Sequence, residues 1–376
     1  MSSIALFRLP HAQTCTLILQ KEGLPQTLDR LTMLDDCRGY VFAPFASSSQ
    51  NPILLLRPDV VETYSCDDVT SKINLPEAHP TGAPPNLPQG EASDSPPLGR
   101  GWGVGSSGVG SSERFHYHLD FCNFHAQLCE GTFRKIVLAR STIIEKPEPQ
   151  SPIHLFQKAC ARYPRMFISL VSTPQGGTWL TASPEILLEE RREDRGEMRE
   201  DSRLFKTIAL AGTADYSDDV RWSEKNIREQ RYVATYMMET LEQFSNDIAE
   251  EGPCTVRAAN LAHLRSDFNF RLDNTHHLGS LLHALHPTPA VCGLPKRDAF
   301  NFILRNESVP RGYYSGFQGP LDVDGMTHLY VSLRCMSIHG NRYRLYAGGG
   351  LLSDSDEESE WNETEAKLNT MRYVLE

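Results

Sequence analysis

The sequence has no long hydrophobic run. Its 376 residues contain no apolar segment near the roughly 20 residues that a membrane-spanning helix needs. The first residues (MSSIALFRLP) lack the basic stretch followed by a hydrophobic one that marks a secretory signal. Basic charge is also scarce, because 48 Asp and Glu outnumber 37 Lys and Arg and give a formal net charge of -11. This balance argues against nucleic acid and anionic membrane surfaces as partners. We therefore predict a cytoplasmic protein.

Paired cysteine motifs are missing as well. The nine cysteines are scattered without a CxxC pair, which argues against a disulfide framework and against a zinc site. We expect them to be reduced and mostly buried. The histidine pairs His116/His118 and His276/His277 have no Cys or carboxylate companions at metal-ligand spacing. Ordinary structural histidines are the favoured interpretation.

Apolar residues are scarce between residues 75 and 112, where proline dominates the first half and glycine with serine the second. This composition predicts a flexible insertion. The glycines at 103, 105 and 108 spell GxGxxG, but a Pro-rich segment precedes them and no patterned helix opens there, so no dinucleotide site is predicted. Residues 1–73 carry strand-like runs without recognisable chemistry, and we interpret them as a peripheral part of the fold. Residues 113–376 have the composition of a globular core, and all the motifs described below lie in it.

The most informative stretch lies near the C-terminus. A predicted strand (341–346) runs into the glycines 348–350, where backbone can approach a ligand because no Cβ intervenes. We predict a turn there and a helix after it, with Ser355 and Glu358 as its capping box.

This predicted helix carries Glu360, Glu363 and Lys367 on one face. Such a face is usually a solvated helix start, with Glu363 and Lys367 as an i,i+4 ion pair. Directly after a glycine turn, and without basic residues that would bind phosphate, the acidic face also suits a divalent cation.

Four other charged residues stand in apolar surroundings. Lys135 lies in a predicted strand (133–144), where it marks either a solvated strand end or a buried amine. Glu185 follows Pro184, and is either an edge-strand glutamate or a half-buried carboxyl whose raised pKa keeps it protonated to serve as an acid. Glu229 lies on a predicted helix of about 223–244. Arg334 lies in an apolar strand and needs an anionic partner such as a carboxylate.

These segments resemble, in order, the motifs of the chorismate-utilising enzymes. The matching stretches lie between residues 133 and 371, and they read KIVLAR, SPE, AGT, EKNIRE, HPTPAVCGLP, RGYYSGFQG and AGGGLL…EWNETEAKL. The resemblance implies an α+β fold, a single domain of two large, mainly antiparallel sheets packed together and flanked by helices. The active site is expected between the sheets.

The resemblance also implies roles for individual residues. Lys135 is the general base, Glu185 the general acid, and Glu229 and Glu363 hold Mg²⁺. The residues implied in substrate binding are Ala211, Gly212, Thr213, His286, Thr288, Ala290, Arg334, Gly348, Gly350 and Lys367. One departure is Gln230, which replaces a family histidine beside the metal ligand and leaves the orientation of Glu229 open.

Three positions distinguish the reactions of this family. Relatives that use ammonia generally have glutamine where Lys135 stands, so lysine indicates water as the nucleophile. Ala211 replaces the nucleophilic lysine of many aminodeoxychorismate synthases, and Ala290 in PTPA resembles isochorismate synthases. We therefore predict a Mg²⁺-dependent isochorismate synthase, in which water attacks C2 of chorismate and the C4 hydroxyl departs, feeding menaquinone or siderophore biosynthesis.

Two alternatives remain open at the level of the sequence. A salicylate synthase would add pyruvate elimination to the same first step. A non-catalytic chorismate-binding protein would account for Gln230. We expect a monomer without a glutamine amidotransferase subunit.

Overall fold

A computed structural model describes residues 2–72, 108–191, 203–217, 219–259, 261–272 and 277–376. Most of the predicted insertion therefore lies outside the described residues, and with it the GxGxxG pattern up to its last glycine. The predicted boundary at residue 112 is too late, because helix α2 (Gly108–Cys129) already begins at Gly108.

One antiparallel sheet of nine strands has the order β14-β7-β18-β17-β9-β8-β1-β2-β6 in the described part of the chain. Its strands are β14 (Gly293–Leu294), β7 (Lys135–Glu145), β18 (Arg342–Leu351), β17 (Cys335–His339), β9 (Gly177–Ser183), β8 (Phe167–Thr173), β1 (Ser3–Arg8), β2 (Thr14–Gln20) and β6 (Val60–Ser65).

The second antiparallel sheet, again of nine strands among the described residues, has the order β12-β13-β11-β10-β16-β15-β4-β5-β3. Its strands are β12 (Ile248–Ala258), β13 (Leu261–Leu272), β11 (Arg203–Asp215), β10 (Ile186–Arg191), β16 (His328–Val331), β15 (Phe317–Leu321), β4 (Gly39–Ala43), β5 (Ile53–Leu56) and β3 (Gln26–Leu28).

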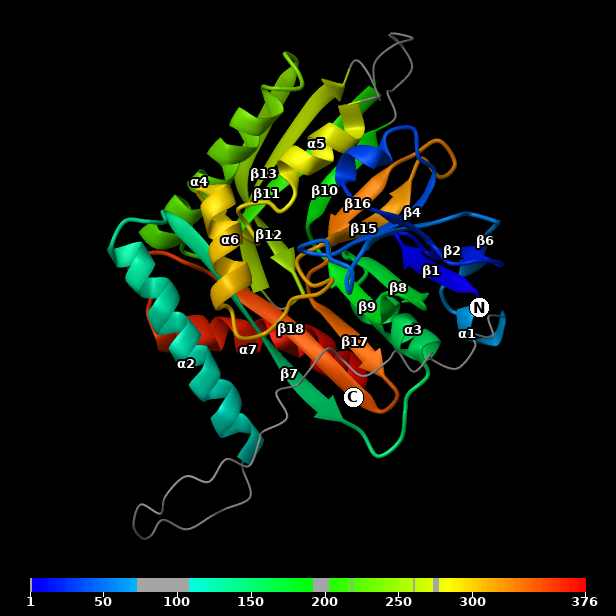
Figure 1. The fold of residues 1–376 in the computed structure, drawn as a ribbon, viewed down its shortest axis with the longest axis horizontal. Coiled ribbons are helices and arrows are strands. Elements are labelled where there is room, and N and C mark those ends of the chain that lie inside the picture. Colours follow the sequence, from blue (N-terminus) through cyan, green and yellow to red (C-terminus); the bar gives the residue numbers. More distant parts are fainter. Residues whose placement is uncertain (1, 73–107, 192–202, 218, 260, 273–276) are drawn as a thin grey trace.

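Helices flank both sheets (Figure 1). Beside α2, they are α1 (Val69–Lys72), α3 (Pro152–Arg162), α4 (Glu224–Leu241), α5 (Leu278–Leu285), α6 (Lys296–Asn306), α7 (Glu357–Leu375) and the 3-10 turn η1 (Leu31–Leu34). Helices α2, α3 and α7 pack on the first sheet and α4 on the second. In the described part of the chain, no helix is both long and apolar enough to cross a membrane.

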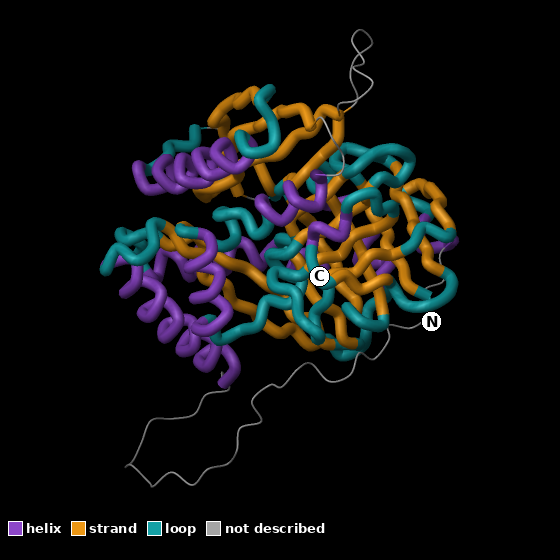
Figure 2. Tube along the Cα trace, turned by 45° about the horizontal axis from the view of Figure 1, so that its top comes forward, coloured by secondary structure: helices purple, strands orange, loops and turns teal. Residues whose placement is uncertain are grey.

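A buried aromatic layer joins the two sheets. Phe167 of the first sheet stacks on Tyr330 of the second, with ring centroids 4.2 Å apart. Phe42 stacks on Tyr313 at 3.8 Å, and both rings are almost fully buried. Burial of such large rings stabilises the contact between the sheets, by roughly 25 cal/mol for each Å² of apolar surface removed from water. The predicted fold, one domain of two packed antiparallel sheets with flanking helices, is confirmed. In Figure 2 the long helices lie mainly on the left of the molecule, and the strands run through its centre and right side.

The N-terminal residues are not peripheral. Strand β1 lies between β8 and β2 in the first sheet, and β4 lies between β15 and β5 in the second. Every residue of both strands is buried. Residues 2–72 carry no recognisable motif, but their apolar side chains form part of the core between the sheets. A strand at the centre of a sheet needs only such side chains.

Candidate active site

A polar cavity is walled by strands of both sheets, and it gathers residues that lie far apart in the sequence. The predicted site residues that line it are Glu185, Ala211, Gly212, Thr213, Glu229, Ala290, Arg334, Gly348, Gly350 and Lys367. Tyr314, Tyr346 and His263 line it too, and the sequence analysis did not select them. The fold therefore brings most of the predicted residues to a single place.

Lys135 begins β7 and is completely buried, so it is not a solvated strand end. Its Nζ lies 3.0 Å from Oε1 of Glu229, which α4 presents to the cavity. Apart from this ion pair, Nζ of Lys135 has no hydrogen-bond partner among the described residues. A buried amine with a single anionic neighbour can exchange its proton with a molecule in the adjacent cavity.

The glycines 348–350 do not form the predicted turn. They belong to β18 and pair in register with β7. A Cβ on Gly350 would overlap Oε1 of Glu229 and lie 2.8 Å from Cε of Lys135. The glycines are needed because side chains, and not only a ligand, approach the strand closely.

Glu185 follows β9 and precedes β10, and its side chain is buried. Burial raises the pKa of Glu185 to about 8, against the opposing effect of the Lys135 charge. Thr288 Oγ1 lies 3.5 Å from Oε1 of Glu185. The carboxyl is therefore protonated in large part near neutral pH, as a general acid must be.

Arg334 is held in an unusual conformation, with a φ of 47°. Its Nη2 donates to Nε2 of His263 at 3.1 Å, and Nδ1 of His263 donates to the Gly212 carbonyl at 3.0 Å. Burial and the Arg334 charge hold the pKa of His263 at about 3, so the ring is neutral and accepts from the guanidinium. Burial lowers the pKa of Arg334 to about 10, which leaves it cationic at neutral pH. Strained backbone at a cavity is typical of functional positions.

The only sequence signal for His263 is the alternation of polar and apolar residues along β13, which marks buried polar positions. His263 occupies a buried position that pairs with Thr213 across the sheet. It belongs to none of the family motifs that the sequence analysis used. Its function in this structure is to orient Arg334, which it contacts directly.

The predicted capping box at the start of α7 is wrong. Asp356 caps the helix, and its Oδ1 accepts from the Ser359 N–H at 3.0 Å. Ser355 lies one residue earlier, and its hydroxyl donates to Oε1 of Glu360 at 2.7 Å. Asp and Ser are comparable N-caps, so sequence alone does not decide between adjacent candidates.

Two carboxylates of α7 face β18. A Cβ on Gly349 would lie 3.1 Å from Oε2 of Glu360 and 3.8 Å from Oε1 of Glu363. Lys225 pairs with Glu360, and Nζ of Lys367 lies 2.5 Å from Oε1 of Glu363. Although burial acts in the opposite direction, the Lys367 charge holds the pKa of Glu363 at about 2. Burial, together with the Glu363 charge, raises the pKa of Glu360 to about 7.

These carboxylates fit a divalent cation. Oε2 of Glu360 is buried and has no hydrogen-bond partner among the described residues, which is costly unless another ligand binds it. Glu229 and Glu363 are the predicted metal ligands, and Glu360 is a third candidate that the prediction omitted. Mg²⁺ is commonly held by one or two carboxylates together with waters and substrate, so the three need not converge on one point.

Not every predicted residue lies in the cavity. The ring of His286 is buried outside it, where Nε2 donates to the Pro44 carbonyl at 3.1 Å. His286 therefore does not line this cavity, and its contact with substrate stays a prediction. Gln230 donates to the Ala209 carbonyl at 3.0 Å and holds α4 on β11, so it does not orient Glu229 through a hydrogen bond.

A family model described as chorismate binding enzyme matches residues 111–376. The chain belongs to the chorismate-binding enzyme family. It is 31% identical to isochorismate synthase EntC of Escherichia coli (strain K12) over 252 residues, which are 64% of this chain and 62% of that protein. It is 32% identical to isochorismate synthase DhbC of Bacillus subtilis (strain 168) over 273 residues, 66% of this chain and 65% of that protein. The chain thus spans just under two thirds of the length of these curated relatives.

A solved structure confirms the fold of this chorismate-binding enzyme. The structure of MenF, the menaquinone-specific isochorismate synthase from Escherichia coli, superposes with a TM-score of 0.72 and 23% identity. The match covers 100% of this chain and 89% of that one. The N-terminal strands, which lie before the family match, are therefore part of the shared architecture.

Proposed function

We propose that this chorismate-binding enzyme is an isochorismate synthase, which adds water at C2 of chorismate and expels the C4 hydroxyl. The observation that carries the proposal is a buried amine and a buried, largely protonated carboxyl beside one cavity. Lys135 supplies the amine and Glu185 the carboxyl. An amine and a largely protonated carboxyl that lie beside the same cavity can divide the work of general base and general acid between them.

The charge of the cavity suits a dicarboxylate. Arg334 and Lys367 line it, and both are cations within reach of bound anions. The hydrogen bond to His263 orients the guanidinium of Arg334. Because His263 is neutral, it does not neutralise the positive charge of Arg334. Gly212, in a left-handed conformation with a φ of 71°, leaves a bulge in β11 where the backbone can approach a ligand. Chorismate carries two carboxylates and would bring a compensating charge to each cation.

Two residues favour water over ammonia and over a covalent route. Lys135 is a base, whereas the glutamine usual in ammonia-using relatives cannot take a proton. Ala211 lines the cavity and offers no amine that could form a covalent adduct with the ring. Ala290 also lines it, as the resemblance to isochorismate synthases predicts.

The reaction can be written with its protons balanced. Lys135 takes a proton from the water whose oxygen bonds to C2, and each ring double bond moves by one position. The C4–O bond breaks, and Glu185 donates a proton to the departing hydroxyl. One water enters and one leaves, so the net reaction is an isomerisation. The proton returns from Lys135 to Glu185 before the next turnover.

Glu229, Glu363 and Glu360 are the residues that would hold magnesium. The cation would bind the ring carboxylate and balance its charge when both are present. Each of these carboxylates is paired with a lysine: Glu229 with Lys135, Glu363 with Lys367 and Glu360 with Lys225.

The direct test is incubation of the purified protein with chorismate, with and without magnesium, followed by chromatography of the products. We expect isochorismate as the product. Salicylate together with pyruvate would instead identify a salicylate synthase, and unchanged chorismate with measurable binding would identify a non-catalytic binding protein. A cytoplasmic location and a monomeric state stay predictions.

A further inference from the structure

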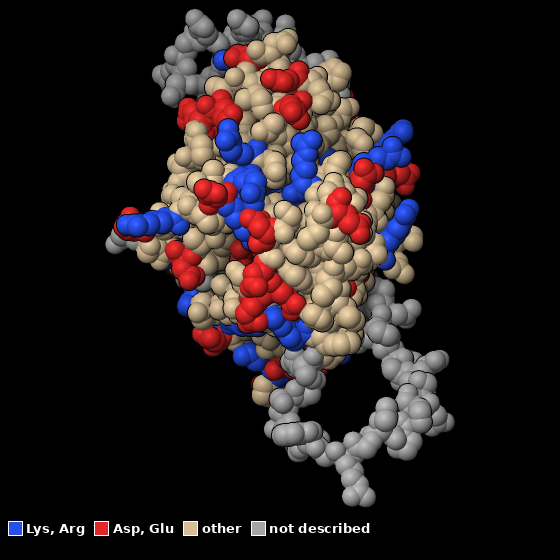
Figure 3. All heavy atoms as spheres, turned by 90° about the vertical axis from the view of Figure 1, so that its left-hand side faces the viewer, with Lys and Arg blue, Asp and Glu red and all other residues tan. Residues whose placement is uncertain are grey.

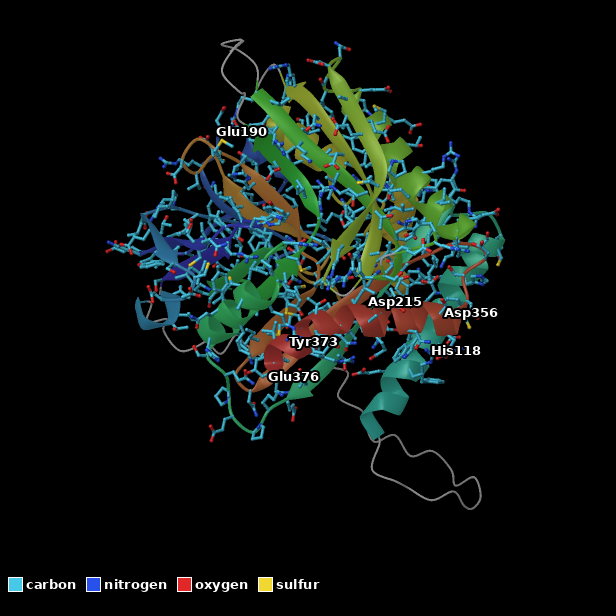
Figure 4. The ribbon with its side chains drawn as sticks, turned by 180° about the vertical axis from the view of Figure 1, so that it is seen from behind. His118, Glu190, Asp215, Asp356, Tyr373 and Glu376 are labelled. Atoms are coloured by element: carbon cyan, nitrogen blue, oxygen red, sulfur yellow. The ribbon has the colours of Figure 1, made fainter. Side chains whose placement is uncertain are left out.

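A second group of metal-ligating side chains lies on the surface, where α2 passes the start of α7. Nδ1 of His118 is 2.7 Å from Oε2 of Glu357, and Sγ of Cys122 is 3.9 Å from Nδ1 of the same ring. The ligand atoms of these three residues all lie within 4.8 Å of one another. Figure 4 shows His118 beside Asp356, the neighbour of Glu357, where the two helices approach.

The sequence pattern favours an ordinary structural histidine at His118, but that interpretation overlooks Cys122, which lies four residues further along the same helix. The carboxylate comes from α7, which is more than 200 residues away. Cys122 is one helical turn from His118 and is exposed, contrary to the prediction that the cysteines are mostly buried. Residues four apart share one face of a helix, so the imidazole and the thiol point to the same side.

The helices that carry the group are fixed to each other. Tyr117 of α2 is buried and meets Trp361 of α7 edge to face, with ring centroids 5.1 Å apart. Arg140 lies over the same indole at 3.7 Å. The three ligand residues therefore lie beside a tightly packed contact between α2 and α7, which limits how far their backbones can move apart.

We propose that His118, Cys122 and Glu357 bind a zinc ion that joins α2 to the first turn of α7. In a tetrahedral zinc site, bond lengths of 2.0 to 2.3 Å place neighbouring ligand atoms about 3.3 to 3.6 Å apart. The distances of 2.7 Å and 3.9 Å bracket these values, so small side-chain rotations would complete the geometry. Water would be the fourth ligand. The thiol loses its proton on binding, and that proton is released to solvent.

The donor set selects the metal. A thiolate and an imidazole suit zinc and are poor ligands for magnesium, so this site is distinct in chemistry from the carboxylates at the cavity. Arg114 is the nearest competitor, with Nη2 3.2 Å from Oε1 of Glu357. The same nitrogen lies 2.7 Å from Oε2 of Glu358, so the guanidinium keeps a partner if the metal takes Glu357. Figure 3 views the side of the molecule on which α2 and the start of α7 lie, where acidic and basic side chains gather together.

The next turns of α2 provide an internal control. His125 and Cys129 repeat the same spacing, with Sγ of Cys129 3.7 Å from Nδ1 of His125. The ring faces the Ser353 carbonyl through Nε2, at 3.1 Å, and these two residues belong to no three-ligand group among the described residues. If the Glu357 carboxylate is required, His118 and Cys122 should bind zinc, and His125 and Cys129 should not.

The test uses the full chain without an affinity tag, treated with a chelator and then titrated with zinc by calorimetry and with cobalt by absorption. We expect one ion per chain and a thiolate-to-cobalt charge-transfer band. Cys122→Ser and His118→Asn should remove the band, and Glu357→Gln should weaken zinc binding. Each loss should exceed the roughly 10- to 100-fold cost of losing a partner outside the metal's ligands. Cys129→Ser should bind as the unaltered protein does.

Zinc should also raise the Tm of the unaltered protein and of Cys129→Ser, but not that of Cys122→Ser. Magnesium in excess should not displace the zinc. The proposal is overturned if no ion binds, if Cys122→Ser binds as tightly as Cys129→Ser, or if magnesium competes. A variant whose circular dichroism shows a lost fold is replaced by Cys122→Ala or Glu357→Ala and measured in the same way.

Discussion

Nζ of Lys135 lies 3.0 Å from Oε1 of Glu229, so the proposed base for water is paired with a proposed magnesium ligand. The pair links the two halves of the proposed chemistry, because a cation bound to Glu229 would compete with the ammonium for the same carboxylate. Metal binding and proton abstraction should therefore depend on each other.

The metal assignment predicts the effect of removing single carboxylates. Glu229→Gln and Glu363→Gln should each abolish most turnover and weaken magnesium binding measured by calorimetry, because each removes an anionic oxygen ligand for a hard cation. Glu360→Gln should weaken binding as well, since its unpartnered Oε2 is buried beside the other ligand.

Glu358 provides the matched control, because it lies on the same helix but is exposed. Glu358→Gln should bind magnesium and turn over chorismate normally. Full activity of Glu229→Gln or Glu363→Gln, or of the unaltered protein in excess chelator, would show that turnover does not need a metal ion bound by these residues.

The acid predicts a pH dependence. Glu185 must be protonated to donate, and its pKa is about 8, so kcat should be lost as the pH rises through about 8. The limit is about a tenfold loss for each further pH unit. A kcat profile that stays level to pH 10 would exclude Glu185 as the acid.

The same carboxyl affects stability. Its folded pKa of about 8 exceeds the ordinary value of 4.5, so the folded protein binds more protons between these values. The free energy of unfolding should therefore fall as the pH rises from about 4.5 to about 8. Glu185→Gln removes this pH-dependent decrease in the free energy of unfolding. At pH 8 the variant should be inactive, but it should be no less stable than the unaltered protein. Denaturant unfolding at several pH values measures both.

The glycine strand predicts a steric effect. Gly350→Ala places a Cβ against Oε1 of Glu229 and 2.8 Å from Cε of Lys135, so it must push apart the pair at the centre of the site. We expect a large loss of kcat with the fold retained, as checked by circular dichroism. Normal turnover in this variant would mean that the pair need not keep its position.

The insertion predicts the absence of an effect. Residues 75–105 contain few apolar side chains and offer little for packing. A variant with an internal deletion of residues 75–105 keeps all of α2, which begins at Gly108. It should retain near-normal kcat and KM with chorismate. A folded deletion variant with strongly reduced turnover would show that the segment contributes to the site.

The fold and most of the residues that line the cavity could be predicted because short motifs keep their residues in order. Lys135 and Glu185 each belong to a contiguous stretch with a recognisable pattern, and the helical period placed Glu229 on α4. What the sequence hides are the contacts between distant strands. No local pattern pairs Arg334, which lies in the bend before β17 and not in the predicted strand, with His263 of β13, because this contact arises only when the sheets pack.

The errors have the same origin. Gly348, Gly349 and Gly350 suggest a turn by their backbone freedom, but long-range pairing with β7 makes them a strand. Packing likewise sets the ring of His286, which lies in a family motif, against the Pro44 carbonyl of the N-terminal segment and outside the lining of the cavity. A motif identifies a residue type at a position, whereas tertiary packing decides where its side chain points.

Removal of the proposed base is the most specific change. Lys135→Gln should abolish isochorismate formation through kcat while chorismate binding changes only a few-fold, because glutamine is polar and of similar length but cannot take a proton. Lys206→Gln is the matched control, since Lys206 pairs with Asp267 at 2.5 Å and does not line the cavity. Near-normal kcat in Lys135→Gln would contradict its role as the base.

The measurement that tests the central claim most directly is turnover of chorismate in water enriched in oxygen-18, with mass spectrometry of the product. If water attacks C2 and the original C4 hydroxyl departs, each isochorismate molecule formed carries one heavy oxygen in its ring hydroxyl. Isochorismate without the label, or anthranilate as the main product when ammonium is supplied, would contradict the account.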